Sequence, residues 1–277
     1  MKISVLIPTH DRSHLLGRAI DSVLGQSLRP SEVLVIDDGS TDETSRLLQE
    51  YQRETIIVIR QEHAGVSAAR NHGIREAKEE WIALLDSDDW WEPEKLEKQV
   101  AFHRKNPDFF MSQTNEVWLR NGVRVNPKKY HQKPNGWVFA DCLERCLISP
   151  SAAIINRRIL DKVGLFDESL PACEDYDLWL RITRLFKVGL VPEKLTIKTG
   201  GHPDQLSAKH WGLDRFRVQS LEKILNLPLS EQQRKETLRV LLTKLDILKN
   251  GSAKRGDKEQ AKAYEQKIGR YQDLRKS

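Results

Sequence analysis

Short apolar runs alternate with amphipathic stretches over the first hundred residues of this 277-residue chain. Each run is four or five residues long and is typical of a strand buried on both faces, so strands are expected at 3–7, 33–36, 56–59 and 81–85. The stretches after them carry helical spacing or helix-capping residues, which predicts helices at 13–26, 44–51, 66–78 and 94–105. This alternation predicts an α/β fold, doubly wound around a mainly parallel sheet.

The pattern is less regular beyond the fourth helix. Residues 106–150 are rich in Asn, Pro and Gly. A strand is expected at 151–160, a helix at 174–183 and a last strand at 195–199. The hydrophobic pattern therefore does not determine the topology of this second half.

The C-terminal residues predict a helical hairpin. Ser230 can cap a helix whose leucines recur at helical spacing, and the Asn-Gly pair at 250–251 is expected to end it. Asp257 can open the second helix. We therefore expect two parts, an α/β domain over 1–212 and a helical extension over 213–277.

The positive charge of the chain lies in that extension. Residues 231–277 carry 13 Lys and Arg against 7 Asp and Glu, whereas the other residues carry 32 against 33. The extension is either a solvated hairpin or a surface for anionic membrane lipids. Nucleic acid is not expected as a partner, because the tail lacks interleaved aromatic residues and the body is near neutral.

Composition restricts the class of protein further. Hydrophobic residues make up 39% of the chain and charged residues 31%, which allows a real core in a soluble protein. No apolar run approaches the roughly 18 residues of a membrane span. The three cysteines, Cys142, Cys146 and Cys173, are few and odd in number, which favours a reducing compartment. A cytoplasmic protein is expected.

An acidic cluster follows the fourth strand directly. Asp86, Asp88 and Asp89 fall within four residues, where their carboxylates repel one another. Ligands in α/β sheets bind beyond the carboxyl ends of the strands, and Asp11 and Asp38 follow the first and second strands at the same edge. Such oxygens suit Mg²⁺ or Mn²⁺. The alternative is a solvated turn in which one aspartate caps the next helix.

Five stretches in order resemble family 2 glycosyltransferases: PTHDR, VIDDGSTDET, GVSAARNHGI, LLDSDDWWEPEKL and ACEDYDLWLRI. The resemblance covers roughly residues 1–210. It implies the sugar-nucleotide-dependent fold called GT-A, with a nucleotide-binding half at about 1–105 and an acceptor half at about 106–212.

The resemblance also implies which residues bind the donor. Pro8, Thr9 and Asp11 would line the base and ribose, and Asp38 would accept a hydrogen bond from the base. Arg70 would lie near the phosphates, where a guanidinium can pair with a carboxylate and a phosphate together. The alternative, purely structural roles are a helix cap for Asp38 and a helix-surface ion pair for Arg70.

The acidic motifs receive separate roles from the resemblance. Asp88 would hold the metal, Asp86 would contact the ribose or the donor sugar, and Asp89 could take either role. Asp175 would be the catalytic base, with Glu174 as the alternative. Both could instead simply begin a helix.

A late loop, GGHPDQLS, also resembles these enzymes, and His202 in it could approach the metal or diphosphate. Residues 205–211 read QLSAKHW, so the Gln-x-x-Arg-Trp motif of processive members is absent. This departure favours the addition of a single sugar over polymer synthesis.

The resulting prediction is a metal-dependent, inverting glycosyltransferase that uses Mn²⁺ or Mg²⁺ and a nucleotide sugar, with a UDP-sugar favoured. The acceptor would be a glycan or glycolipid hydroxyl in surface glycan assembly, reached at the inner face of the membrane if the basic tail binds there. Two alternatives remain: a nucleotide-sugar-binding protein without transferase activity, and a nucleotidyltransferase.

Overall fold

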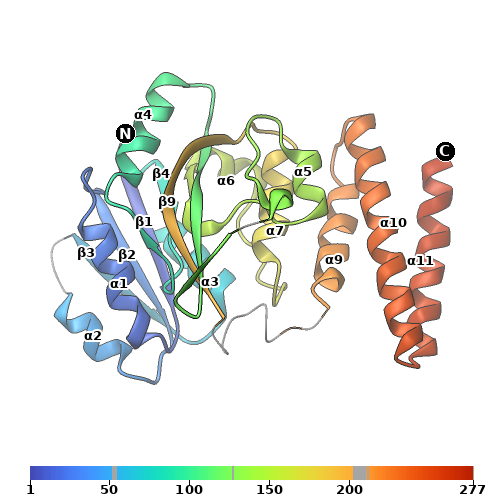
Figure 1. Ribbon diagram of the computed structural model, residues 1–277, viewed down its shortest axis with the longest axis horizontal. Helices are drawn as coiled ribbons and strands as arrows, with labels where there is room; N and C mark the ends of the chain where they lie inside the picture. Colours follow the sequence, from blue (N-terminus) through green and yellow to red (C-terminus); the bar gives the residue numbers. More distant parts are fainter. Residues whose placement is uncertain (52–54, 127, 202–209, 211, 277) are drawn as a thin grey trace.

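A nine-stranded mixed sheet forms the centre of the protein in the computed structural model, which describes residues 1–51, 55–126, 128–201, 210 and 212–276. Its main strand order is β3-β2-β1-β4-β8-β6-β9-β5. Helices lie on both faces of the sheet, and three C-terminal helices lie at the far end of the molecule from β3 (Figure 1). The predicted α/β class is confirmed.

The N-terminal half of the sheet is parallel. Its strands are β1 (Ile3–Thr9), β2 (Glu32–Asp38), β3 (Ile56–Gln61) and β4 (Trp81–Leu84). In β1, Ile3, Val5 and Ile7 face one apolar cluster and Leu6 faces the other, as the two-residue period of a strand requires. Burial on both faces explains why these strands read as continuous apolar runs.

The other half introduces antiparallel pairs. It contains β5 (Trp90–Trp91), β6 (Met111–Arg120), β7 (Val123–Val125), β8 (Ala153–Asn156) and β9 (Gly189–Gly200). The pairs β4–β8, β8–β6, β6–β7 and β9–β5 are antiparallel, whereas β6 and β9 run parallel. The sheet is therefore parallel where it was expected to be and mixed beyond β4.

Two layers of helices cover the sheet. One layer contains α1 (Ser13–Leu24), α2 (Thr44–Glu50) and α4 (Lys95–Lys105). The other contains α3 (Val66–Glu76), α5 (Phe139–Glu144), α6 (Arg157–Val163) and α7 (Glu174–Thr183). Short 3₁₀ turns occur at Lys129–His131 and Pro150–Ala152.

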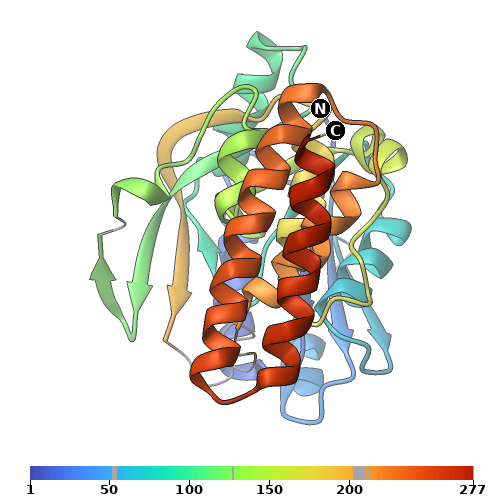
Figure 2. The same cartoon turned by 90° about the vertical axis from the view of Figure 1, so that its right-hand side faces the viewer.

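The predicted C-terminal hairpin is present. Helix α9 (Asp214–Leu225) leads into α10 (Glu231–Lys254) and α11 (Lys258–Lys276), and the last two run side by side along one flank of the molecule (Figure 2). Ser230 accepts from the backbone N–H of Gln233 and completes a capping box, as its position before the leucine pattern predicted. In the described residues, no helix combines the length and apolar character that a membrane span needs.

Two local predictions were wrong, and one expected strand is longer than predicted. The stretch 151–160 is a strand only over Ala153–Asn156, because the Asn156 side chain accepts from the N–H of Arg158 and starts α6. The strand expected at 195–199 is the end of the longer β9. Helix α10 continues through residues 250–251 to Lys254, and the chain turns at Gly256, whose φ of +80° suits glycine.

Candidate active site

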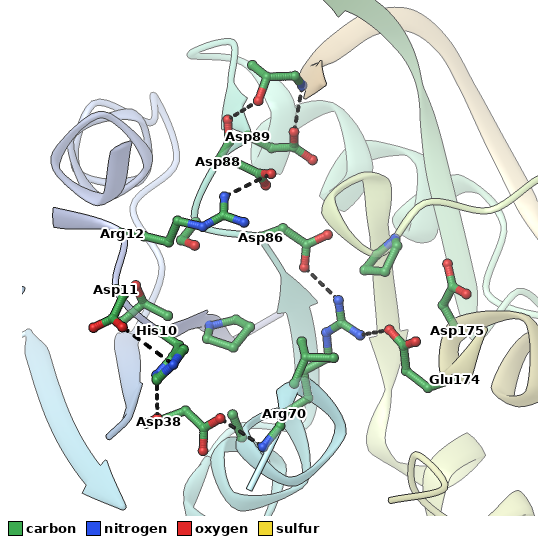
Figure 3. Close-up of a pocket in the computed structure, with 18 of the residues that line it drawn as sticks. His10, Asp11, Arg12, Asp38, Arg70, Asp86, Asp88, Asp89, Glu174 and Asp175 are labelled. Atoms are coloured by element: carbon green, nitrogen blue, oxygen red, sulfur yellow. Dashed lines mark hydrogen bonds and ion pairs between the residues drawn. The ribbon is translucent and has the colours of Figure 1, made fainter. Parts of the chain in front are cut away.

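A pocket of about 640 Å³ opens beyond the carboxyl ends of the parallel strands (Figure 3). Residues predicted for the nucleotide side line it: Pro8, Thr9, Asp11, Asp38 and Arg70. The acidic residues predicted for metal and sugar chemistry line it as well: Asp86, Asp88, Asp89, Glu174 and Asp175. His202 lies outside the described residues. The structure thus brings together every predicted site residue that it describes.

Asp38 is held by the chain at the end of β2. Its Oδ1 accepts from the N–H of Ala64 at 2.9 Å and from the side chain of Gln61 at 2.7 Å, and its Oδ2 accepts from the N–H of Gly65 at 2.9 Å. These bonds fix the loop that begins α3. Contact between Asp38 and a base stays a prediction, and any such contact would share a carboxylate that the loop already uses.

Two histidines that the motifs did not single out stack beside Asp38. The rings of His10 and His63 lie 3.9 Å apart at an interplanar angle of 19°, and both line the pocket. The Nδ1 atom of His10 lies 2.8 Å from the carbonyl oxygen of Asp38, and that of His63 lies 2.9 Å from Oδ2 of the same residue. Their stacked rings form part of the pocket wall beside Asp38.

The backbone at Asp11 is strained. Its φ of +50° is unusual for a residue other than glycine, and the conformation directs the carboxylate to the N–H groups of Thr41 and Asp42 at 2.7 and 3.2 Å. The Thr41 bond lowers the pKa of Asp11. Asp11 therefore joins the first loop of the pocket edge to the second.

Arg70 is the electrostatic centre of the pocket floor. It is 3% exposed and donates to Asp86 Oδ1 and to Glu174 Oε1, both at 2.7 Å (Figure 3). Burial raises the pKa of Glu174, as does the charge of Asp175, and the cation of Arg70 opposes both effects. The surface ion pair considered for Arg70 is excluded, because both partners come from the other walls of the pocket.

Asp88 and Asp89 have separate partners. Oδ2 of Asp88 lies 3.3 Å from Nη1 of Arg12, whereas Asp89 accepts from the hydroxyl of Ser151 at 2.7 Å and from the N–H of Thr199 at 2.8 Å. Burial raises the pKa of each carboxyl, and the adjacent aspartates raise it further. The solvated turn is excluded for Asp89, which is 2% exposed.

The residues present fit a divalent ion that takes most of its ligands from a substrate. Mg²⁺ is commonly held by one or two carboxylates together with waters and phosphate oxygens. Asp88 lines the pocket and carries a raised pKa, so a cation beside it would relieve the local repulsion. No three His, Cys, Asp or Glu side chains in the described part of the chain are grouped to hold a metal by themselves.

Asp175 lies on the opposite side of the pocket from His10 and Asp11 (Figure 3). It is the second residue of α7, which follows Cys173 in a left-handed conformation with φ of +62°. Its Oδ1 accepts from the N–H of Tyr176 at 2.6 Å, and the thiol of Cys146 donates to Oδ2 at 3.3 Å. Asp175 is thus oriented by hydrogen bonds, whereas Glu174 is bound by Arg70.

Four ionisable residues that line the pocket were not among the predicted site residues: His10, Arg12, His63 and Lys198. His10 and Arg12 lie within the quoted PTHDR stretch, but neither was predicted from it as a site residue. Lys198 had one available signal, a single charge in the apolar strand pattern LTIKT. His63 had none, because its place depends on how the loop before α3 folds.

Comparisons with known proteins agree with this geometry. The family model described as Glycosyl transferase family 2 matches residues 4–164, and a second, Glycosyltransferase like family 2, matches 134–216. An uncharacterized glycosyltransferase of Rickettsia bellii is 31% identical over 75% of this chain and 31% of its own length. A counterpart from Rickettsia typhi is 31% identical over 73% of this chain and 65% of its own length. The chain thus spans between a third and two thirds of these relatives.

A named relative and two solved structures extend the comparison. The Escherichia coli protein named UDP-Glc:alpha-D-GlcNAc-diphosphoundecaprenol beta-1,3-glucosyltransferase WfgD is 32% identical over 66% of this chain and 70% of its own length. S. aureus TarS 1-349, solved with UDP-GlcNAc, superposes with a TM-score of 0.73 at 18% identity, covering 98% of this chain and 92% of its own.

The mannosyltransferase PcManGT from Pyrobaculum calidifontis, solved with GDP-Man and Mn²⁺, gives a TM-score of 0.64 at 16% identity over 99% of this chain and 83% of its own. At these identities the two structures establish the fold alone, which is the predicted GT-A type. The family model covers more than half of the chain in sequence, and the motifs that match it surround one pocket. The chain belongs to glycosyltransferase family 2.

Proposed function

We propose that this protein is an inverting glycosyltransferase that moves one sugar from a nucleotide sugar to an acceptor hydroxyl. The observation that carries the proposal is the position of Asp175, across the pocket from His10 and Asp11, with Arg70, Asp86 and Glu174 between the two sides (Figure 3). A carboxylate at that place can take a proton from an acceptor that enters opposite the donor. Glu174 is the weaker candidate, because Arg70 binds it at 2.7 Å.

The proposed reaction is a direct displacement. The acceptor oxygen forms a bond to the anomeric carbon, its proton passes to Asp175, and the bond from that carbon to the diphosphate oxygen breaks. Mn²⁺ or Mg²⁺, when bound at Asp88, would neutralise the leaving diphosphate. Arg70 would hold Asp86 and Glu174 in place, so that the donor sugar meets a fixed floor.

The substrates are proposed from the relatives. A UDP-sugar is favoured because WfgD is named for UDP-Glc and TarS was solved with UDP-GlcNAc. A glycolipid acceptor is favoured because the name of WfgD includes a diphosphoundecaprenol-linked sugar. Surface glycan assembly at the inner face of the membrane is the setting in which both would meet.

The test separates binding from transfer. Calorimetric titration with UDP, GDP and dTDP, each with and without Mn²⁺, is expected to give metal-dependent binding of one diphosphate, lost in Asp88→Ala. Asp175→Asn is expected to keep that binding and to lower transfer by at least about 10³-fold, because the amide cannot accept the proton.

Three results would contradict the proposal. A folded protein that binds none of the three diphosphates has no donor site of this kind. Release of pyrophosphate from a nucleoside triphosphate, in place of nucleoside diphosphate from a nucleotide sugar, would make the protein a nucleotidyltransferase. Binding without transfer by the wild type, across a panel of lipid-linked acceptors, would leave the binding-protein alternative.

A further inference from the structure

Lys198 is a cation in the pocket to which neither the motifs nor the proposed reaction gives a role. It lies near the end of β9 and lines the same pocket as Asp86, Asp89 and Asp175. Among the described residues its Nζ has one hydrogen-bond partner, Ser149 Oγ at 3.3 Å. An ammonium group carries three donors, so Lys198 has donors left for a ligand.

A buried carboxylate stabilises the charge of this side chain. Glu116 lies one strand away on β6, where Trp118 pairs with Lys198, and it forms an ion pair with Lys133 at 2.9 Å. The side chains of Glu116 and Lys133 are 3% and 6% exposed. Burial would raise the pKa of Glu116, but the charges of Lys133 and Lys198 and hydrogen bonds from Ser149 and Trp118 lower it to about 2.

This arrangement is costly for stability alone. Buried ion pairs often contribute less than apolar residues of the same size, because both charges lose their hydration. Glu116 nevertheless stays ionised and interacts with both Lys133 and Lys198. Burial by itself would lower the pKa of Lys198, but Glu116 and the pocket aspartates raise it, so the group stays charged.

The neighbouring residue fixes Lys198 to the acidic turn. Thr199 donates its N–H to Asp89 Oδ1 at 2.8 Å and its hydroxyl to the carbonyl oxygen of Asp88 at 2.7 Å. The end of β9 therefore carries Lys198 to the turn where the diphosphate is proposed to bind. Arg70, by contrast, is already bound by two carboxylates.

We infer that Lys198 binds a phosphate oxygen of the donor's diphosphate, from the pocket wall formed by β9. This inference rests on the proposed function, since it assumes a nucleoside diphosphate at Asp88. Lys198 would then compensate part of the charge of the leaving group with a fixed protein cation, which a metal ion would supplement.

The test compares a diphosphate with its nucleoside. We expect Lys198→Met to weaken the binding of UDP at least about tenfold by calorimetry in the presence of Mn²⁺, and to change the affinity for uridine less than about twofold. Lys198→Arg should retain most of the UDP affinity. Lys194→Met is the matched control, because Lys194 is an exposed lysine on the same strand and lies outside the pocket lining. If the wild type prefers GDP or dTDP, the preferred diphosphate and its nucleoside replace UDP and uridine.

Each outcome decides. Unchanged UDP affinity in Lys198→Met, or an equal loss for uridine, overturns the inference. An increased KM for the acceptor with unchanged UDP binding would mean that Lys198 binds a phosphate of the acceptor. That result would also overturn the inference. If Lys198→Met does not fold, Ser149→Ala should lower UDP affinity about two- to fivefold, and no loss there counts against the inference. A wild type that binds no diphosphate overturns the proposed function instead.

Discussion

Charged side chains in this protein are positioned by pairing across long sequence separations. Arg70 and Glu174 are 104 residues apart, and their contact joins α3 to the start of α7. Arg12 and Asp88 are 76 residues apart, and their contact joins the loop after β1 to the acidic turn after β4. At the scale of the residue, the arrangement of the pocket and the stability of the fold therefore depend on the same ion pairs.

Arg70→Met is expected to destabilise the fold by about 3 kcal/mol, because it leaves Glu174 buried without its cation. The measurement is urea unfolding followed by circular dichroism. Arg46→Met is the matched control: its pair with Glu43 is 77% and 69% exposed, so its loss should change stability by less than about 0.5 kcal/mol. Equal effects of the two variants would contradict a structural role for the Arg70 network.

His103 makes the fold sensitive to acid. Burial lowers its pKa to about 4, from about 6.5 in the unfolded chain. Below pH 6.5 the unfolded chain takes up a proton that the folded protein does not, so stability falls as the pH falls from 6.5 to 4, by at most about 3 kcal/mol.

His103→Gln should therefore flatten the pH dependence of the free energy of unfolding, measured in urea at pH 7 and pH 4.5. The ring of His103 contacts the Phe109 carbonyl and the Ser112 hydroxyl, so some stability at pH 7 is lost as well. His14→Gln, at an exposed position, should leave the slope unchanged. A parallel slope in both variants would show that His103 does not titrate in this window.

Helices are fitted to the sheet by residue size as well as by polarity. Gly73 in α3 faces β2, and a Cβ built there would lie 2.7 Å from the Cδ1 atom of Ile36. That approach lets α3 pack close enough to place Arg70, one turn earlier, over the pocket floor. At the scale of the element, the glycine is a packing requirement in the middle of a helix.

Gly73→Ala and Gly269→Ala are expected to have opposite signs. Alanine is favoured in helices by up to about 1 kcal/mol, but the clash with Ile36 should make Gly73→Ala destabilising by at least about 1 kcal/mol. A Cβ at Gly269 in α11 would have no atom within 4 Å, so Gly269→Ala should stabilise by about 0.5–1 kcal/mol. Thermal and urea unfolding of both variants provide the check, and a stabilising Gly73→Ala would contradict the packing argument.

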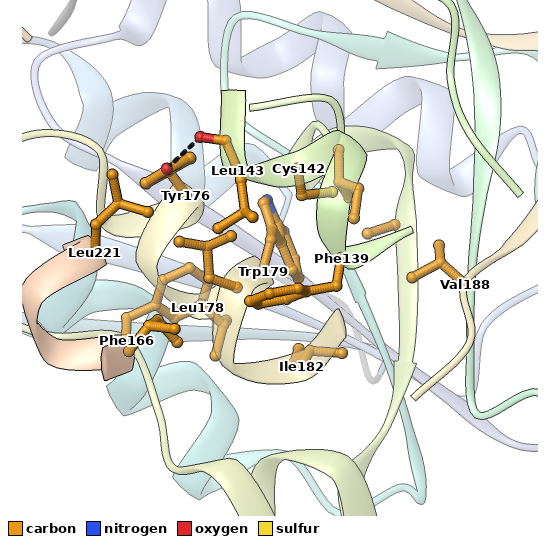
Figure 4. Close-up of a cluster of buried hydrophobic side chains, with 14 of the residues drawn as sticks. Phe139, Cys142, Leu143, Phe166, Tyr176, Leu178, Trp179, Ile182, Val188 and Leu221 are labelled. Carbon is orange, nitrogen blue, oxygen red and sulfur yellow. Dashed lines mark hydrogen bonds between the residues drawn. The ribbon is translucent and has the colours of Figure 1, made fainter. Parts of the chain in front are cut away.

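The C-terminal helices share a core with the α/β part. Residues of α9 and α10, such as Leu221 and Leu241, belong to the apolar cluster that contains Trp179 and Phe166. Figure 4 shows Leu221 beside that cluster, with Trp179 at its centre. At the scale of the whole molecule, the extension is packed onto the layer that carries α7, and hence Asp175.

The basic helical hairpin is proposed to bind anionic lipid. With 13 positive against 7 negative side chains in residues 231–277, the protein should co-sediment with vesicles of anionic phospholipid at low salt and detach in about 0.5 M salt. Charge reversal of exposed Lys258 and Lys262 on α11 should weaken binding, whereas reversal of exposed Arg104 and Lys105 on α4 should not. Binding that salt does not change, or none at low salt, would contradict the proposal.

The sequence by itself determined the elements with local signals. The strands β1 to β4 and the helices between them follow from apolar runs and helical spacing. Nine of the predicted site residues lie in motifs at strand or helix ends, and Arg70 lies within α3. These features could be predicted because burial on both faces of a parallel sheet leaves continuous apolar runs in the chain, and because strand ends collect at one edge.

Only the tertiary structure determined which charged groups of the site contact one another. Pairing of β6 with β9 brings Glu116 close enough to interact with Lys198, and no local period encodes that pairing. Glu174 and Asp175 are adjacent acids in the sequence, yet one is bound by Arg70 and the other is oriented by Cys146 and Tyr176. The physical reason is the same in each case: the energy of a charge depends on which distant groups share its burial.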